Sequence, residues 1–448
     1  MPFKHTKILI VCLVALFSVV IANNDDRDSH RVAIPTRTIL AKRNSTSPIR
    51  ETKGGITRHL GISRPRRFET VWTWFLDSDG SLSWKDLGSN AGWQTYNSSL
   101  FISAPEVLNV WPSSQDLRVA FAIQADTGHM MYLPYFAGKW ESDKWHDLGG
   151  RFTYRPTPVS GTTGLSGVFG VNEKGELLYN ALYNQYLPLK WTEWVLMGTG
   201  FTSEVAATSA SPGMWEVVGL ANGTYKHGLT DYEGSSPEWT DLGRPPHSIE
   251  LGWPKIVVIP DLRTGGSPRG TVDVVVVADG VVWHKLYDGT SWSEEWTRLP
   301  PSHDGLEIMN SQELLVGYRS SWPTTGYLFS RGSDNCVYQN QFSYSGYNET
   351  TGQYYMDWLG WNSLWCSKVG DSVSTDTRQS PLAIAAIAQY DNRFDLVIQT
   401  PSGTLEHTQV YRENGTFEGV IPKWVAIKGN PWKFVTGNVL RDGTAGGA

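Results

Sequence analysis

Short runs of β-branched and aromatic residues, separated by turn-forming residues, recur along most of the chain. Residues 271–277 form one such run, residues 281–287 the next, and residues 292–299 a third. Asp279-Gly280 separates the first two runs and predicts a tight hairpin, because both central positions of a type I′ turn need positive φ. A stretch rich in small residues, 204–210, suits a crowded inner strand. The pattern therefore predicts units of four antiparallel strands without helical periodicity.

One phrase returns throughout the same region: a tryptophan followed, a few residues later, by Leu-Gly or a close variant. Its seven copies begin at Trp84, Trp145, Trp194, Trp239, Trp296, Trp358 and Trp424. Repeats about 40 to 65 residues long are typical of propeller or solenoid arrays, and four-stranded units favour the propeller. The sequence thus predicts an all-β fold, a seven-bladed β-propeller of four-stranded antiparallel blades.

The two ends of the repeated region predict how the propeller closes. The first unit shows only two strands of its own, at residues 70–76 and 81–87, whereas residues 432–440 resemble the missing inner strand. We therefore expect the N- and C-terminal strands to share one blade. The propeller is predicted over residues 68–442, followed by a flexible tail at 443–448.

The repeat also resembles a known lectin family. The resemblance is carried by the Asp-Gly hairpins, the aromatic residues after them, the paired tryptophans, the terminal Leu-Gly and the openings Phe152-Thr153 and Phe201-Thr202-Ser203. Over residues 68–442 these features resemble the bacterial seven-bladed fucose-binding propeller lectins (the PLL-like family) and, more distantly, the fungal fucose-specific lectins. The resemblance implies multivalent, shallow sugar sites between blades, with fucose as the expected ligand. The arginines that the fungal lectins are expected to repeat in each site do not recur here at one blade position.

Composition agrees with a globular all-β chain and narrows its partners. Aromatic residues make up 12% of the 448 residues, including 21 Trp, and turn-forming Gly and Pro are abundant. The formal net charge is −6 and the body of the chain has no long basic run, which disfavours nucleic acid and anionic membrane surfaces.

The N-terminus predicts export. Lys4 and Lys7 precede the apolar run 8–22, so residues 1–22 are predicted to be a signal peptide cleaved after Ala22, with a retained membrane anchor as the alternative. Residues 23–67 are polar and are predicted to be a disordered pro-segment or linker. We expect a secreted, extracellular glycoprotein with no membrane insertion. Its Asn-x-Ser/Thr glycosylation sequons begin at Asn44, Asn97, Asn222, Asn348 and Asn414.

Two cysteines remain once Cys12 leaves with the signal peptide. Cys336 and Cys366 form a disulfide in one interpretation and are separate buried thiols in the other. The chain has no Cys/His spacing of the zinc type, and we expect neither a metal site nor a cofactor.

Sugar binding needs an aromatic face against the apolar side of a pyranose and a few fixed polar groups for its hydroxyls. The candidate carbohydrate-binding residues are Trp72, Trp140, Tyr179, Trp191, Trp283, His284, Trp292 and Tyr338. His227 occupies a strand position equivalent to that of His284. Packing between blades is the alternative for each aromatic residue, and it is the role we predict for the second tryptophan of each pair, at Trp145, Trp194 and Trp296.

Signatures of an enzyme are few, and no catalytic residue is assigned. Neighbouring acids occur at Asp77/Asp79, Glu141/Asp143 and Glu294/Glu295, near predicted turns, and no nucleophile elbow, zinc-protease motif or phosphate loop is present. The main hypothesis is a carbohydrate-binding protein with glycans or glycoproteins as partners. The alternatives are a propeller scaffold for protein–protein interaction and an enzyme with its site in the central channel.

Overall fold

The structure is a computed structural model of the chain. The residues that it describes are 60–63, 72–76, 80–87, 90–96, 99–110, 117–136, 139–141, 144–161, 165–184, 187–211, 213–259, 271–288, 291–301, 315–319, 325–332, 336–348, 353–365, 384–388, 393–399, 405–411 and 425–427. All regular elements in these ranges are β-strands, which confirms the all-β prediction. The predicted signal peptide and C-terminal tail lie outside the described residues. The described residues include no helix long and apolar enough to cross a membrane.

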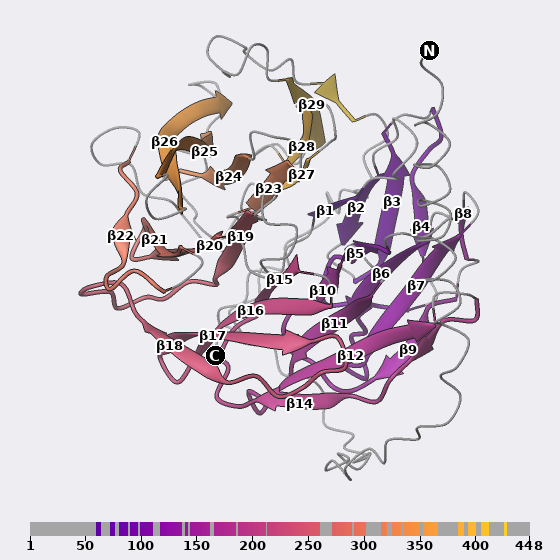
Figure 1. Ribbon diagram of the computed structural model, residues 1–448. Helices are drawn as coiled ribbons and strands as arrows, with labels where there is room; N and C mark the ends of the chain where they lie inside the picture. The colour runs from indigo at the N-terminus through magenta and orange to yellow at the C-terminus, as the bar shows by residue number, and fades with distance from the viewer. Residues whose placement is uncertain are drawn as a thin grey trace, which may run out of the picture. The chain divides into compact units, whose positions relative to one another are not determined.

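The described strands form seven antiparallel sheets, each built from strands that follow one another along the chain (Figure 1). We number them in chain order: sheet 1 (β1–β4), sheet 2 (β5–β9), sheet 3 (β10–β14), sheet 4 (β15–β18), sheet 5 (β19–β22), sheet 6 (β23–β26) and sheet 7 (β27–β30). The strand bounds are β1 Leu60–Ser63, β2 Trp72–Leu76, β3 Leu82–Asp86, β4 Gln94–Tyr96, β5 Glu106–Asn109, β6 Arg118–Ile123, β7 Met130–Phe136, β8 Lys139–Trp140, β9 His146–Gly149, β10 Thr157–Ser160, β11 Ser166–Val171, β12 Leu177–Asn184, β13 Lys190–Trp191, β14 Val195–Gly198, β15 Ala206–Ser211, β16 Met214–Ala221, β17 Thr224–Asp231, β18 Trp239–Gly243, β19 Lys255–Ile259, β20 Thr271–Ala278, β21 Val281–Tyr287, β22 Thr297–Arg298, β23 Leu315–Arg319, β24 Thr325–Arg331, β25 Val337–Asn348, β26 Gln353–Trp365, β27 Ile384–Ala388, β28 Arg393–Gln399, β29 Leu405–Tyr411 and β30 Val425–Ala426.

The second and third strands of sheets 4 and 5 are joined by the tight turns that the sequence predicts. Asp279 and Gly280 have φ values of 48° and 74°, and they connect β20 to β21. Asn222 and Gly223 make the same turn between β16 and β17, with φ values of 52° and 78°. Positive φ at both positions matches the right-handed twist of the two strands, so the turn fixes the register of each hairpin.

Sheet 1 departs from one expectation about the ends of the chain and leaves another untested. Its first strand is β1, which pairs with β2 and lies in the segment predicted to be disordered. The C-terminal segment 432–440, expected at that place, lies outside the described residues. The sequence did not predict β1 because residues 23–67 were interpreted together from their polar composition, in which one short strand does not stand out.

The predicted strand at residues 292–299 is also different in the structure. Trp292 forms an isolated bridge with Tyr287, and regular pairing resumes only at β22. The edge strands of sheets 2 and 3 are interrupted in a similar way, because β8 and β9 both pair with β7, and β13 and β14 both pair with β12. The interruption separates the two tryptophans of each pair, so that they occupy different environments.

The terminal Leu-Gly of the repeat is a β-bulge at the edge of its sheet. In sheet 2 the register shifts beside Leu148, Gly149 has a φ of 72°, and its backbone N–H donates to Asp147 Oδ1 at 2.7 Å. Gly243 has a φ of 70° and donates to Asp241 Oδ1 at 2.8 Å in sheet 4. Glycine tolerates this left-handed conformation and the aspartate satisfies its N–H, which explains the Asp-Leu-Gly sequence.

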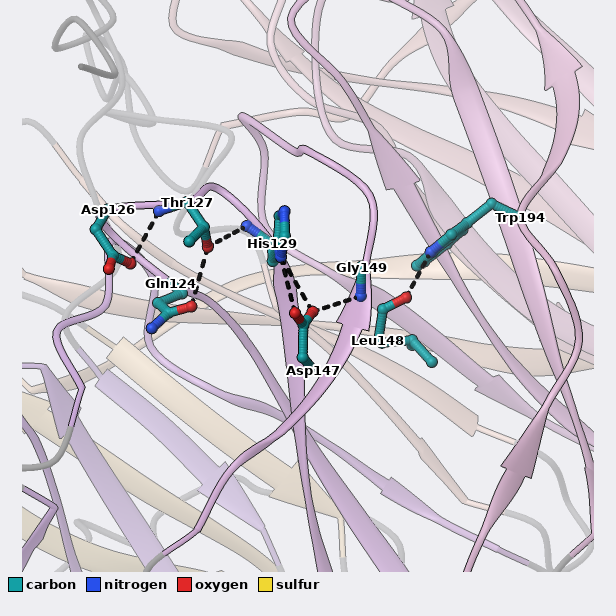
Figure 2. Close-up of polar contacts among 8 residues, drawn as sticks. All are labelled: Gln124, Asp126, Thr127, His129, Asp147, Leu148, Gly149 and Trp194. Atoms are coloured by element: carbon teal, nitrogen blue, oxygen red, sulfur yellow. Dashed lines mark hydrogen bonds and ion pairs between the residues drawn. The ribbon is translucent and has the colours of Figure 1, made fainter. Parts of the chain in front are cut away.

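The second tryptophan of each pair joins two successive sheets, as predicted. Trp194 Nε1 donates to the Leu148 carbonyl oxygen at 2.9 Å, and Figure 2 shows the indole directed at that oxygen, next to the Asp147–Gly149 bulge. Trp296 Nε1 donates to the Leu242 carbonyl at 2.9 Å in the same way. Trp145 is buried and its ring centroid lies 4.8 Å from that of Phe101. The bulges of sheets 2 and 4 therefore each accept a hydrogen bond from the next repeat, whereas Trp145, among the described residues, joins its neighbours by packing alone.

One predicted copy of the repeat occupies a different strand. Trp84 lies on β3, the third strand of sheet 1, whereas the copies beginning at Trp145, Trp194, Trp239, Trp296 and Trp424 lead into or start an edge strand. In sheet 1 the edge strand β4 follows Trp93 instead, and Trp93 packs in a cluster with Val397 of sheet 7.

The first strands of the sheets lie side by side, in chain order from β1 to β27, and β27 in turn lies next to β1. Four charged residues at or just before β5, β10, β15 and β19 connect these strands. Arg155 bonds to Glu106 (Nη1–Oε1 2.6 Å) and to Glu204 (Nη2–Oε1 3.0 Å). Lys255 Nζ lies 3.0 Å from Glu204 Oε1. Positive and negative groups alternate along this row, so that two cations, Arg155 and Lys255, balance the negative charge of the buried Glu204.

Two remaining sequence predictions, the disulfide and the glycosylation sequons, involve residues that the structure describes. Cys336 is buried and disulfide-bonded, and its predicted partner Cys366 lies outside the described residues. Asn222 is exposed on its hairpin turn, and Asn348 ends β25. The sequons at Asn44, Asn97 and Asn414 lie outside the described residues.

Candidate functional site

Four of the eight predicted sugar-binding residues are buried, which corrects their assignment as exposed ring faces. They are Trp72, Trp140, Tyr179 and Tyr338. The Arg118 guanidinium lies 4.8 Å from the ring centroid of Trp72, and Trp140 packs on the same ring at 5.3 Å. Packing of these rings against the neighbouring sheet leaves no face for a pyranose.

Tyr179 is buried at the junction of sheets 3 and 4 and its hydroxyl is used internally. It accepts a hydrogen bond from Trp215 Nε1 at 2.8 Å and donates to the Tyr232 carbonyl at 3.2 Å. Burial raises the pKa of the Tyr179 hydroxyl, and the Trp215 hydrogen bond only partly offsets this. This junction is therefore filled by the protein's own side chains.

Three sheets carry a histidine–carboxylate pair at the same register between their second and third strands. His284 Nδ1 lies 3.0 Å from Asp273 Oδ2 in sheet 5, and His407 Nε2 lies 2.8 Å from Asp395 Oδ1 in sheet 7. In sheet 4, His227 Nε2 pairs with Glu216 Oε2. All three carboxylates are buried, so each imidazole is held by an acid that water does not reach.

A tryptophan from the next sheet covers two of these pairs. Trp292 packs on His227 with ring centroids 4.9 Å apart, and Trp358 packs on His284 at 6.4 Å. Trp358 Nε1 also donates to Asp273 Oδ2 at 3.0 Å. The polar groups beside these tryptophans therefore form their hydrogen bonds with one another. Trp283, a further predicted residue, is half-buried and packs against the core of sheets 4 and 5.

The His284–Asp273 pair gives the stability of the protein a pH dependence. Burial tends to lower the pKa of His284, but the charge of Asp273 and the hydrogen bond to it outweigh burial, so the pKa lies above its usual value. A raised pKa in the folded state means that the stabilisation is complete below the unfolded value of about 6.5 and is lost as pH rises through the folded value.

We therefore expect His284→Gln to destabilise the protein more at about pH 6 than at about pH 8.5. Chemical denaturation of the wild type and the variant at both pH values measures this difference. An equal effect of the substitution at the two pH values would show that the ion pair contributes nothing.

The junction of sheets 2 and 3 differs from those of sheets 4 and 5 and of sheets 5 and 6, because both members of its polar pair are exposed to water. Trp191 of β13 lies against Tyr132 of β7, with ring centroids 5.5 Å apart. On sheet 2, His146 of β9 stacks on Tyr132 at 5.0 Å and 20°, and His146 Nε2 lies 2.9 Å from Glu141 Oε2. The side chains of His146 and Glu141 are 36% and 41% exposed. A half-buried indole and a hydrated polar pair are thus brought together at one place.

Burial dominates the electrostatics of Tyr132, the residue that Trp191 and His146 share at this junction. The pKa of the Tyr132 hydroxyl is raised, mainly by burial and further by the Glu141 charge, whereas the neighbouring Trp191 indole acts to lower it. Tyr132 therefore stays neutral and supports the two groups that face water. Among the sequence predictions, only Trp191 identified this junction. The available signal was that Glu141 and His146 each directly follow a tryptophan of the pair Trp140 and Trp145, but Glu141 was considered only as a neighbour of Asp143.

The structure adds little support for the neighbouring acids or for a metal site. Glu294 and Glu295 are exposed, and Asp77, Asp79 and Asp143 lie outside the described residues. No cluster of three or more metal-ligating side chains occurs in the described part of the chain. A surface pair, His129 with Asp147 at 3.0 Å, braces the bulge of sheet 2 (Figure 2).

Comparison with known proteins finds solved structures that are similar to this chain at low identity. No protein-family model and no curated protein matches the chain. It is similar to the lectin of Aleuria aurantia in complex with Fucα1-6GlcNAc, with 14% identity, 67% of this chain and 94% of that chain covered, and a TM-score of 0.42. A structure describing a six-bladed β-propeller and a fucose recognition mode for Aleuria aurantia lectin matches with 13% identity, coverage of 67% and 95%, and a TM-score of 0.43.

A third similar structure is BBS1N in complex with ARL6DN, at 14% identity, with 81% of this chain and 94% of that chain covered and a TM-score of 0.44. The similar structures thus include fucose-binding propeller lectins and a complex of a different kind. At these TM-scores they assign neither a blade number nor a ligand to this chain.

Proposed function

We propose that this chain is a secreted, carbohydrate-binding protein built as a closed seven-bladed β-propeller. Two observations support the architecture: the seven described sheets, and the side-by-side series of first strands that returns from β27 to β1. Phe75 of sheet 1 also shares a core cluster with Val397 and Leu405 of sheet 7. The resemblance of the repeat to the PLL-like lectins agrees with seven units.

The observation that carries the function is the junction of sheets 2 and 3. Trp191 supplies an apolar indole, and the half-exposed Glu141 and His146 supply hydrogen-bonding atoms beside it. An apolar platform next to a few fixed polar groups is what a pyranose requires. Binding needs no bond to be made or broken, so the protein acts by recognition of a glycan at a blade junction.

The test is a glycan array probed with the full-length chain, purified from the medium of a secreting eukaryotic cell. We expect selective binding that the free sugar competes away, with fucosylated glycans the first to examine. If the recovered protein is folded and binds no glycan on the array, carbohydrate binding is refuted. Retention of the protein inside the cell would refute secretion.

A further inference from the structure

The exposed polar pair at the junction between sheets 2 and 3, Glu141 and His146, offers hydrogen-bond acceptors to a ligand. Glu141 is a carboxylate, so His146 donates to it through Nε2, and in the neutral form of the imidazole Nδ1 is then an acceptor. Glu141 Oε1 and His146 Nδ1 make no hydrogen bond to any residue in the described ranges. Two unused acceptors therefore lie within one half-exposed pair.

Such a pair selects ligands by the hydrogen bonds that they donate. A sugar hydroxyl donates to either atom, whereas a carboxylate or sulfate group only accepts. An acidic sugar would also bring its charge next to Glu141, and like charges at an interface are strongly unfavourable. We propose that this junction binds neutral glycans through adjacent hydroxyl groups and excludes sialylated, uronic and sulfated ones. This inference rests on the proposed carbohydrate-binding function.

The exposure of the polar pair distinguishes the junction of sheets 2 and 3 from the junction of sheets 4 and 5. Trp292 is half-buried there as Trp191 is here, but the polar pair beside it, His227 and Glu216, has side chains only 5% and 1% exposed. A sugar placed on Trp292 would meet no hydrated polar group of that pair. Trp292 is therefore a matched control for Trp191, since both follow the third strand of their sheet and pack on the preceding sheet.

The test is an array of matched glycans, each printed in a neutral form and in a form carrying a terminal sialic acid, uronic acid or sulfate. For the wild type we expect binding at least about tenfold stronger to the neutral members. Trp191→Ala should reduce binding more than tenfold, whereas Trp292→Ala should leave it within about twofold. Circular dichroism of each variant confirms that it is folded.

Glu141→Gln keeps the shape of the side chain and serves as the second variant. Removing the charge should reduce the discrimination against acidic members to below about threefold, with the neutral members still bound. Preference of the wild type for acidic glycans, or full binding by Trp191→Ala, would overturn this inference while leaving carbohydrate binding itself in place. A wild type that binds no glycan would overturn the proposed function, and this inference with it.

Discussion

Glu204→Gln is expected to lower the free energy of unfolding by about 3 to 5 kcal/mol, as measured by chemical denaturation. Glu204 is 3% exposed and accepts hydrogen bonds from Arg155 and Lys255, which come from the neighbouring sheets. Neutralising it leaves two cations near the first strands with less compensation than they have in the wild type. The large effect comes from the largely buried cations that remain, because removing the buried partner of such a pair costs far more than an exposed pair contributes.

Glu173→Gln is the matched control for this substitution. Glu173 is 53% exposed and lies 3.9 Å from Arg151, so solvent screens the pair. We expect a change below about 1 kcal/mol. Similar effects of the two substitutions would contradict the role that we give to the row of charges along the first strands.

Trp296→Ala is expected to destabilise the protein by about 3 to 5 kcal/mol, the usual range for removing a buried large aromatic side chain. The buried indole packs on Tyr225 at 5.3 Å and donates to the Leu242 carbonyl of the preceding sheet. The substitution opens a cavity between two sheets and leaves that carbonyl without its donor.

Trp296→Phe separates the two contributions. It keeps much of the packing and loses the hydrogen bond, so we expect a smaller loss of about 1 to 2 kcal/mol in the same denaturation experiment. A phenylalanine variant as unstable as the alanine variant would mean that the hydrogen bond, rather than packing, dominates. An alanine variant as stable as the wild type would contradict the assignment of the second tryptophan to inter-sheet packing.

Local signals in the sequence were sufficient to predict most of the fold. Asp279-Gly280 specifies a turn by its own backbone preferences, and the β-branched runs around it specify strands. The repeated Trp and Leu-Gly positions were visible as a repeat, although their physical link, an indole N–H donating to a bulge carbonyl in the preceding repeat, was not. β1 was missed because a four-residue strand gains its stability from pairing rather than from its own pattern.

The candidate site was predicted less well, because exposure at a junction depends on which side chains the next sheet supplies. Trp140 and Trp191 follow equivalent strands, yet Trp140 is buried against Trp72 and Tyr135 whereas Trp191 lies beside a hydrated pair. A linear sequence shows neither arrangement. His146 illustrates the same limit, since it belongs to the repeated phrase and gains its role only through Glu141 and Tyr132.

The central claim is that a neutral glycan binds where Trp191, Glu141 and His146 meet. The most direct measurement is a crystal structure of the full chain with the best neutral glycan from the array. The account predicts a closed seven-bladed ring, with the sugar's apolar face on Trp191 and adjacent hydroxyls donating to Glu141 Oε1 and His146 Nδ1. A sugar bound in the central channel or at another junction, with the Trp191 junction empty, would contradict it.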